Sequence, residues 1–277
     1  MAVFGAKQPH PQSLTVGGVT CVMDLQSPAR LGEYMVKFQE MADFINRAYW
    51  PDLVMAAKAY ANEPSVVNDI GTPNLMTYQD FQIGANEYLF DGGYILNGDI
   101  SKVFEVDENL ITEEATRSWY KNDAPLHPYD GDTTPNYTGF KDAKTLNAKG
   151  EMEESKVFDI AGKYSWIKAP RYNSLPMQVG PIANIVVNYV KGNKNVVPVV
   201  DKFLAETGLP VSAVLSTLGR TACRMIEAKI IADNALKALN NLIENLKVDD
   251  STCAKYQIDA NKEYKGRFIG NVPRGLL

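Results

Sequence analysis

The sequence is 277 residues long, and its hydrophobic content of 45% is enough for a sizeable buried core. It carries 28 basic and 33 acidic residues, a net charge of −5 without a long basic run, which argues against nucleic acid as a partner. The longest apolar stretch, residues 182–190, is interrupted by Asn184 and Asn188 and is far shorter than the ~20 residues of a membrane span.

The first predicted elements are two packed helices over residues 28–62. Ser27-Pro28 offers an N-cap followed by proline in the first helical turn, and apolar side chains then recur at every third or fourth position. Pro51 either ends this helix or opens a second one.

Residues 63–168 are expected to form small antiparallel β ribbons and long loops. Short β-type runs at 87–90, 93–96 and 101–105 are separated by Asp-Gly, Asn-Gly and Asp-Glu turns. Residues 122–159 are rich in Asp, Gly, Pro, Thr and Lys, which predicts an exposed excursion.

The second half of the chain is predicted to contain a helical bundle over residues 176–250. Residues 181–190 are apolar enough for a buried helix, residues 196–206 suit another, and residues 214–246 keep a long helical stripe. Residues 251–277 are expected to form a loop. The predicted fold class is therefore mainly α with small antiparallel β ribbons (α+β), and the sequence has no Gly-rich phosphate loop.

Cysteine and histidine, the common soft metal ligands, are scarce. Cys21, Cys223 and Cys253 are odd in number and widely spaced, which gives neither a disulfide framework nor a metal-ligand motif. The histidines are His10 and His127. We therefore expect reduced thiols, and we expect that the 277 residues alone have too few ligands for a metal centre.

Four sequence runs stand out: Lys7-Gln8-Pro9-His10, Trp166-Ile167-Lys168-Ala169-Pro170-Arg171, Ser216-Thr217-Leu218-Gly219-Arg220-Thr221 and Pro273-Arg274-Gly275. In order and rough spacing they resemble the central part of a [NiFe]-hydrogenase large subunit, over nearly the whole chain. That family holds nickel and iron with two Cys-x-x-Cys pairs, one near each end of the subunit, and the 277 residues contain no such pair. The resemblance thus implies that residues 1–277 are a cut, partial large subunit without its metal ligands.

Arg274 is the catalytic candidate that this resemblance implies, because the Pro-Arg-Gly arginine of the family hangs its guanidinium over the open face of the nickel-iron centre. Splitting H2 needs a base beside the metal that accepts the hydride, and a fixed guanidinium also donates hydrogen bonds to the diatomic ligands. Pro273 would shape the ligand pocket by contact. The tripeptide alone also suits a surface arginine in a Pro-Gly turn.

Glu113 and Lys168 form a second implied site. In related subunits a carboxylate and a lysine at these places bond to waters around a second metal ion, usually magnesium, which needs such outer partners. The sequence leaves open whether Glu113 or Glu114 is the aligned carboxylate. The structural alternatives are a first-turn helix carboxylate and a solvated lysine.

His10 resembles the family's histidine that faces the small subunit near its first iron-sulfur cluster, where an imidazole can tune the cluster potential without ligating it. The alternative for His10 is a structural histidine whose hydrogen bonds are satisfied within the fold. His127 is interpreted as structural. Arg220, Arg224 and Glu227 follow helical spacing and are expected to satisfy one another inside the fold.

The resemblance implies the catalytic subunit of a respiratory uptake hydrogenase that interconverts H2 with protons and electrons. Its implied cofactors are a nickel-iron centre with CN and CO ligands and Mg in the full-length subunit, with none on this chain, which is expected to be inactive alone. The implied partners are H2, a small subunit with iron-sulfur clusters and, indirectly, a cytochrome b or another electron acceptor. Membrane association is expected through these partners on the periplasmic face, without a signal or transmembrane segment in this chain. The alternatives are a metal-free quinone-reductase relative of the complex I type and a non-catalytic helical docking subunit.

Overall fold

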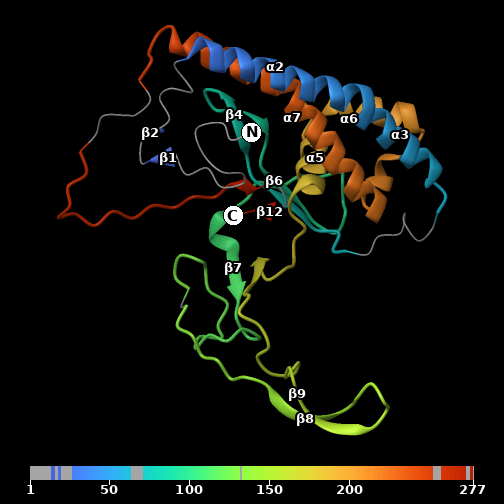
Figure 1. The fold of residues 1–277 in the computed structure, drawn as a ribbon, viewed down its shortest axis with the longest axis vertical. Coiled ribbons are helices and arrows are strands. Elements are labelled where there is room, and N and C mark those ends of the chain that lie inside the picture. Colours follow the sequence, from blue (N-terminus) through green and yellow to red (C-terminus); the bar gives the residue numbers. More distant parts are fainter. Residues whose placement is uncertain are drawn as a thin grey trace.

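Helices pack together at one end of the molecule, and a long arm of strands and loops extends away from them (Figure 1). We call residues 108–172 the arm and the other described residues the body. The predicted fold class, mainly α with small antiparallel ribbons, is confirmed. The computed structural model describes residues 27–63, 71–131, 133–251 and 257–271, together with the backbone of residues 14–15, 18–19, 272 and 275–276.

The first helical segment of the body runs without a break through Pro51. Helix α2 (Pro28–Phe44) begins at the N-cap Ser27, a π-helix follows (Ile45–Tyr49), and α3 (Trp50–Ala59) continues from it. Proline lacks an amide hydrogen and crowds the carbonyl one turn earlier, and the wider π-turn just before it accommodates both. Pro51 thus lies in the first turn of α3, as the second-helix alternative predicts, but α3 continues α2 end to end (Figure 1), so the two helices do not form the packed pair expected over residues 28–62.

Three further α-helices complete the body among the described residues. Helices α5 (Pro181–Val190) and α6 (Val197–Thr207) match the predicted helices closely. Helix α7 (Thr217–Leu246) begins later than predicted, because Ser216 caps it and a separate 3-10 turn (Val211–Val214) precedes it. Within the described part of the chain, every helix is too short or too polar to cross a membrane.

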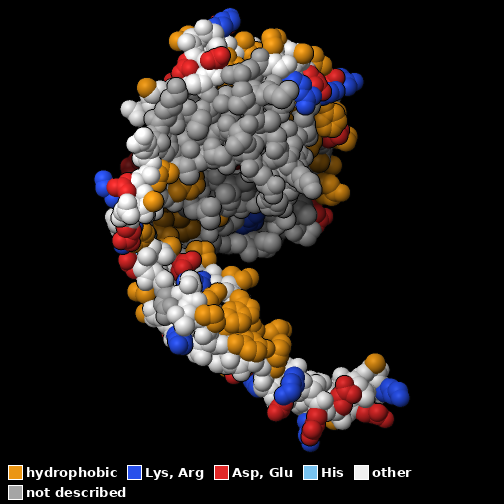
Figure 2. Space-filling view, turned by 60° about the vertical axis from the view of Figure 1, so that its left-hand side comes forward, with side chains coloured by type: hydrophobic (Ala, Val, Ile, Leu, Met, Phe, Trp, Pro, Cys, Tyr) orange, Lys and Arg blue, Asp and Glu red, His pale blue; other side chains and the backbone are white. Residues whose placement is uncertain are grey.

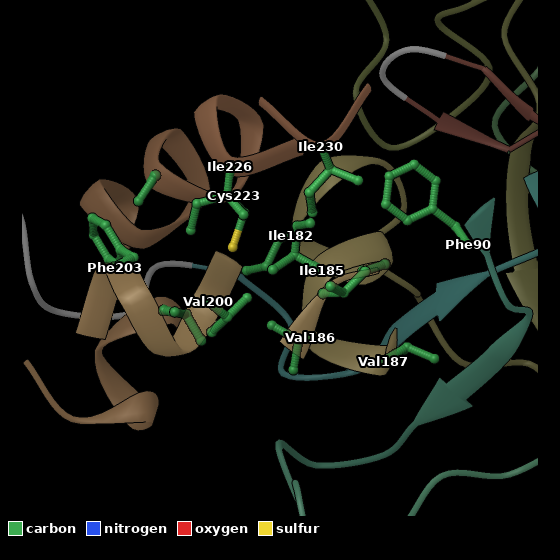
Figure 3. Close-up of a cluster of buried hydrophobic side chains, with 14 of the residues drawn as sticks. Phe90, Ile182, Ile185, Val186, Val187, Val200, Phe203, Cys223, Ile226 and Ile230 are labelled. Carbon is green, nitrogen blue, oxygen red and sulfur yellow. The ribbon is translucent and has the colours of Figure 1, made fainter. Parts of the chain in front are cut away.

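The main hydrophobic core lies between α3, α5, α6 and α7 (Figure 3). Cys223 and Ile226 of α7 and Ile185 of α5 are at most 1% exposed. Phe203 of α6 packs edge to face on Trp50 of α3, with ring centroids 6.1 Å apart. The stability of the body therefore depends on contacts between helices that are far apart in the sequence.

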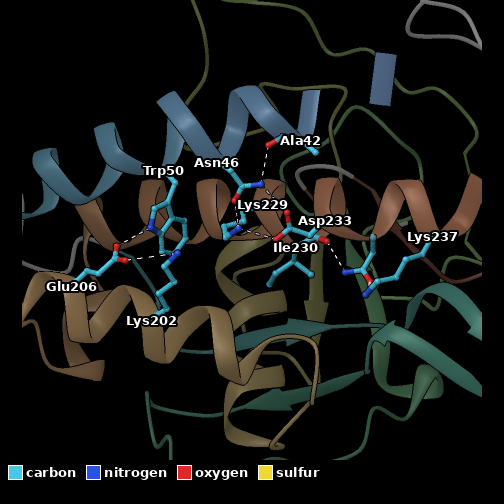
Figure 4. Close-up of polar contacts among 10 residues, drawn as sticks. Ala42, Asn46, Trp50, Lys202, Glu206, Lys229, Ile230, Asp233 and Lys237 are labelled. Carbon is cyan, nitrogen blue, oxygen red and sulfur yellow. Dashed lines mark hydrogen bonds and ion pairs between the residues drawn. The ribbon is translucent and has the colours of Figure 1, made fainter. Parts of the chain in front are cut away.

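A polar cluster ties α2 and α3 to α6 and α7 beside this core (Figure 4). The buried Lys229 donates to Asn46 in the π-helix and, at 2.8 Å, to Asp233. Trp50 Nε1 donates to Glu206 Oε2 at 2.8 Å. Because the buried ammonium has both a carboxylate and an amide partner, this cluster is best explained by helix packing.

Strands occur as antiparallel pairs that attach loops to the helices. The strand predicted at 101–105 is wrong: Phe104 alone forms a bridge, to Tyr94, because Asp99 accepts from the amide of Ser101 and turns the chain just before it. The pairs are β1 (Leu14–Thr15) with β2 (Gly18–Val19), β3 (Leu75–Thr77) with β6 (Gly93–Ile95), β4 (Asp80–Gly84) with β5 (Glu87–Phe90), β7 (Ile111–Glu114) with β10 (Ala169–Tyr172), β8 (Lys141–Leu146) with β9 (Met152–Val157), and β11 (Asn271–Val272) with β12 (Gly275–Leu276).

The arm begins at a 3-10 turn (Glu108–Leu110), has the β7–β10 pair at its base, and ends in the β8–β9 hairpin (Figure 1). Aromatic rings hold its middle: Trp166 packs against Trp119 at 5.2 Å and against Tyr137 at 5.8 Å between ring centroids. Much apolar surface stays exposed, Ile167 being 79% accessible. Figure 2 shows this apolar surface along the arm and charged side chains at its far end.

Candidate functional site

A lysine and a glutamate meet at the base of the arm. Glu113 lies in β7, and Lys168 directly precedes β10. The two strands pair with Glu113 opposite Pro170, which brings the two side chains together. Lys168 Nζ lies 3.1 Å from Glu113 Oε2, and the two side chains are 12% and 32% exposed. These two residues, 55 positions apart in the sequence, are therefore direct neighbours.

Glu113, and not Glu114, is the partner of Lys168. Successive residues of a strand point to opposite faces, and Glu114 lies opposite Ala169 in the ladder. The position of Glu113 in a strand also rules out the helix first-turn alternative. The structure thus assigns the lysine contact to the first of the two carboxylates.

The pair lies in a narrow pocket. Lys168 Nζ lies 5.2 Å from the centroid of the Tyr120 ring, and the Glu113 amide donates to the carbonyl of Leu126 at 2.8 Å. A Cβ at Gly131 would be 3.3 Å from Lys168 Nζ and 3.6 Å from Glu113 Oε2, so glycine leaves space beside the pair. The pocket volume of about 10 Å³ is close to the minimum for one water molecule.

This pair fits a place beside a hydrated metal ion better than the role of a direct ligand. Oε2 of Glu113 accepts from Lys168, and a carboxylate has a second oxygen that can accept from a water molecule. No group of three or more His, Cys, Asp or Glu side chains that could hold a metal is found among the described residues. Magnesium keeps several of its waters and needs groups that orient them. The geometry suits such a role, which stays a prediction.

His10, Pro273 and Arg274, the other predicted site residues, lie outside the described residues, as do Cys21 and Cys253. The strands β11 and β12 lie on either side of the Pro-Arg step in the sequence, and their backbones pair antiparallel. The predicted roles of these residues therefore stay predictions.

Cys223 and His127 take structural positions. Burial in the core raises the pKa of the Cys223 thiol to about 12, so it stays protonated at neutral pH and is a poor metal ligand. The prediction of a reduced thiol is confirmed for this cysteine. His127 Nδ1 accepts from the amide of Tyr129 at 3.1 Å, which stabilises a turn in the arm.

A buried polar network that the sequence analysis missed joins β3, α5, α7 and β11. We call it the asparagine network; its members are Thr77, Asn184, Glu227 and Asn271. Asn184 Nδ2 donates to Glu227 Oε1 at 2.7 Å, and Asn184 Oδ1 accepts from Asn271 at 3.0 Å and from Thr77. The available signal was the pair Asn184 and Asn188, four residues apart in an apolar helix, because buried amides require partners.

Glu227 is the titratable member of this network. Burial raises its pKa, the hydrogen bond from Asn184 lowers it, the negative charge of Asp80 raises it, and the positive charge of Arg224 lowers it, with a net upward shift. The expected mutual pairing along α7 is only partial, since Arg220 Nε donates to a glutamine outside the helix at 2.7 Å. The carboxylate is instead directed toward α5.

The same arrangement of helices and strand pairs occurs in solved hydrogenases. The reduced, active form of the Ni-Fe-Se hydrogenase from Desulfomicrobium baculatum aligns with 99% of this chain and 51% of its own, with a TM-score of 0.73 and 26% identity. The fold is that of a hydrogenase large subunit. The family model for nickel-dependent hydrogenases matches residues 1–277, and the chain belongs to this family.

Two relatives illustrate the range of the family. The quinone-reactive Ni/Fe-hydrogenase large chain of Wolinella succinogenes is 54% identical over 277 residues, which cover 100% of this chain and 48% of the relative. The hydrogenase-2 large chain of Escherichia coli is 32% identical, with coverage of 100% and 49%. The chain thus spans about half the length of the curated relatives it matches. Family membership favours the hydrogenase over the quinone-reductase alternative.

Proposed function

We propose that this chain is part of the catalytic large subunit of a [NiFe] hydrogenase that oxidises H2 to two protons and two electrons. The match of the family model to residues 1–277 carries this proposal. The Glu113–Lys168 pair adds support, because it is a preformed group of the kind that a hydrated ion requires. The name of the Wolinella relative, a quinone-reactive hydrogenase, supports H2 uptake in respiration.

In this proposal the complete subunit carries a nickel-iron centre with CN and CO ligands, which supplies the site where H2 is split. Arg274 would act as the base beside that site by accepting a proton at a neutral guanidine nitrogen, and its N–H groups would donate hydrogen bonds that order the pocket, while Pro273 would shape the pocket by contact. Arginine is a poor base in water because its side chain is normally protonated, so this role requires a buried and preorganised surrounding.

The remaining site residues support the centre. Glu113 and Lys168 orient waters around a magnesium ion in the complete subunit, the glutamate as acceptor and the lysine as donor. His10 faces the first iron-sulfur cluster of a small subunit, where its imidazole tunes the cluster potential. Electrons then pass through this partner to a cytochrome b or another acceptor, and these partners associate the protein with the membrane on its periplasmic face.

The proposal predicts that the 277-residue chain alone is inactive. Thiolates in fixed geometry supply the metal affinity, and the chain has no Cys-x-x-Cys pair to provide them. Metal analysis of the isolated chain should find no stoichiometric nickel, whereas the full-length subunit purified with its small subunit should contain it. Stoichiometric nickel on the isolated chain would contradict the proposal that the metal ligands lie outside these 277 residues.

Two observations on the full-length protein test the function itself. The gene should encode Cys-x-x-Cys upstream of this segment and Asp-Pro-Cys-x-x-Cys downstream, and a continuous reading frame without them would point to a metal-free relative. Arg274→Lys should retain nickel and lose about 10²–10³-fold in kcat for H2 oxidation, since a lysine ammonium cannot replace the planar set of N–H donors of the guanidinium. Unchanged kcat would remove the catalytic role of Arg274.

A further inference from the structure

Asn271 is tied to the body just ahead of the Pro-Arg-Gly run. Its Nδ2 donates to Thr77 Oγ1 at 2.9 Å, to Asn184 Oδ1 at 3.0 Å, and to the carbonyl of Tyr78. Its Oδ1 accepts from the amide of Tyr78 at 3.1 Å. The side-chain amide therefore bonds both the N–H and the C=O of one residue, as a neighbouring strand would, and this fixes its position in two directions.

Two of the partners of Asn271 are buried. Thr77 is 1% exposed in β3, and Asn184 is 3% exposed on α5, which lines the main core. Glu227 determines which way the Asn184 amide faces, because a carboxylate can only accept. Asn184 Nδ2 must then point to α7, which leaves its Oδ1 toward Asn271. The asparagine network thus extends from the core to β11 with a defined hydrogen-bond direction.

The backbone after Asn271 is also paired. Asn271 lies opposite Leu276 and Val272 opposite Gly275, so β11 and β12 flank the two residues between them. In a paired ladder the position of one strand determines that of the other. A side chain that acts on a bound gas molecule must be placed within about 1 Å, since a misplacement of that size can cost about 10²-fold in rate.

We infer that Asn271 is a positioning residue for H2 oxidation: through Thr77, Tyr78 and Asn184 it fixes the strand pair that flanks Arg274. The inference rests on the function proposed above, because that function gives Arg274 its role. Asn271 acts through the backbone of β11 and β12.

The test uses the full-length large subunit in complex with its small subunit, purified with its metal. Asn271→Ala removes the bonds to β3 and α5. Asn193→Ala is a matched control: this asparagine is 8% exposed and donates to Asp91 at 2.8 Å and to Asn188 at 3.0 Å at the other end of α5. Both changes remove a hydrogen-bonded side-chain amide that is at least partly buried, and only Asn271→Ala loosens β11.

The first readout is hydrogen–deuterium exchange of the peptide that contains residues 271–276, together with nickel content. Asn271→Ala should speed exchange there about tenfold or more while nickel stays stoichiometric, because each lost hydrogen bond weakens the local structure. Asn193→Ala should leave that peptide unchanged. Undiminished protection of residues 271–276 in Asn271→Ala would overturn the anchoring role.

The second readout is a double-mutant cycle on kcat. Asn271→Ala alone should lower kcat about 10–100-fold with KM for H2 within about twofold. In an Arg274→Lys background the same change should cost less than about threefold, because the group that it positions is already lost. An equal loss in both backgrounds would mean a general structural effect and would overturn the inference.

Three further cases distinguish a failure of the positioning role from a failure of the proposed function. If Asn271→Ala fails to assemble, Asn271→Asp replaces it, since it keeps the acceptor for Tyr78 and loses the donors; the same exchange and kcat criteria then apply. If the wild-type complex holds no nickel and does not oxidise H2, the proposed function fails and this role fails with it. If the wild-type complex is active and Asn271→Ala does not change hydrogen–deuterium exchange at residues 271–276, only the positioning role fails.

Discussion

The body and the arm are stabilised in different ways. In the body, helices distant in the sequence share a dry core, and buried amides such as Asn184 find partners on other elements. In the arm, the outer strands β8 and β9 form a local hairpin, aromatic rings cluster in the middle, and large apolar side chains such as Ile160, 78% exposed, face outward. The difference shows that the body is stabilised by contacts buried between its helices, whereas the arm leaves much of its apolar surface exposed.

The two candidate sites lie where these regions join or where a loop returns to the body. The Glu113–Lys168 pair belongs to the β7–β10 ladder at the base of the arm. Asn271 belongs to a strand that returns to β3 and α5 after α7. The side chains to which we assign roles in the proposed function thus lie on segments that are hydrogen-bonded to the body or to its junction with the arm.

The largest effect is expected in the core. Ile226→Ala should lower the free energy of unfolding of the full-length protein by about 2–5 kcal/mol, because Ile226 is 0% exposed and its loss leaves a cavity between helices. Ile160→Ala in the arm is the control and should change it by less than about 0.5 kcal/mol. Denaturant titration measures both, and equal effects would contradict the contrast between the two regions.

A smaller effect is expected where arm and body meet. Lys168→Met should destabilise the protein by about 1–3 kcal/mol, because it leaves the partly buried Glu113 carboxylate without its lysine. The double change with Glu113→Gln should recover part of this loss, since no charge is then left unpaired. Thermal unfolding measures the loss, and metal analysis should show less bound magnesium in the single variant.

The pH dependence of Glu227 tests the buried network. Burial raises its folded-state pKa above the ordinary 4.5, so the folded protein binds this proton more tightly than the unfolded chain. Its contribution to stability is full below pH 4.5 and is lost as the pH rises through the raised pKa. Glu227→Gln lacks this titration, so the stability advantage of wild type over the variant should fall with rising pH. Asp80, Arg224 and Asn184 also face the carboxylate; a pH-independent difference would contradict the assignment.

The smallest effect is expected at the far end of the arm. Lys156 pairs with Asp142 at 2.8 Å across β8 and β9, and the two side chains are 70% and 86% exposed. Lys156→Ala should therefore leave the midpoint of denaturant unfolding unchanged, with and without added salt. A loss comparable to that of Lys168→Met would mean that the arm is as tightly organised as the body.

Sequence patterns predicted the elements whose signal is local. The apolar run of α5 and the long stripe of α7 follow helical spacing, and the turns around β5 are marked by glycine and asparagine. The prediction of a strand at 101–105 failed because Asp99 accepts from the Ser101 amide and turns the chain, so that only Phe104 forms a bridge, to Tyr94. The π-turn before Pro51 has no pattern of its own in the sequence.

The candidate sites also differ in how far the sequence could predict them. Glu113 and Lys168 were proposed from family resemblance, and strand register, which the sequence does not state, shows that Glu113 is the glutamate that contacts Lys168. The asparagine network was missed because Thr77, Asn184 and Asn271 are separated by more than 80 positions and meet only after α5 is buried. Long-range polar contacts of this kind follow from tertiary packing and leave little trace in local spacing.

The buried Cys223 can report how often the hydrophobic core opens. Its sulfur is 0% exposed and its pKa is about 12, so a thiol-modifying reagent in solution meets a reactive thiolate only when α7 separates from α5 and α6. The rate of modification at this position therefore counts opening events of the core. This rate therefore measures local opening of the helical body at a single sulfur atom, in the assembled protein and without any substitution.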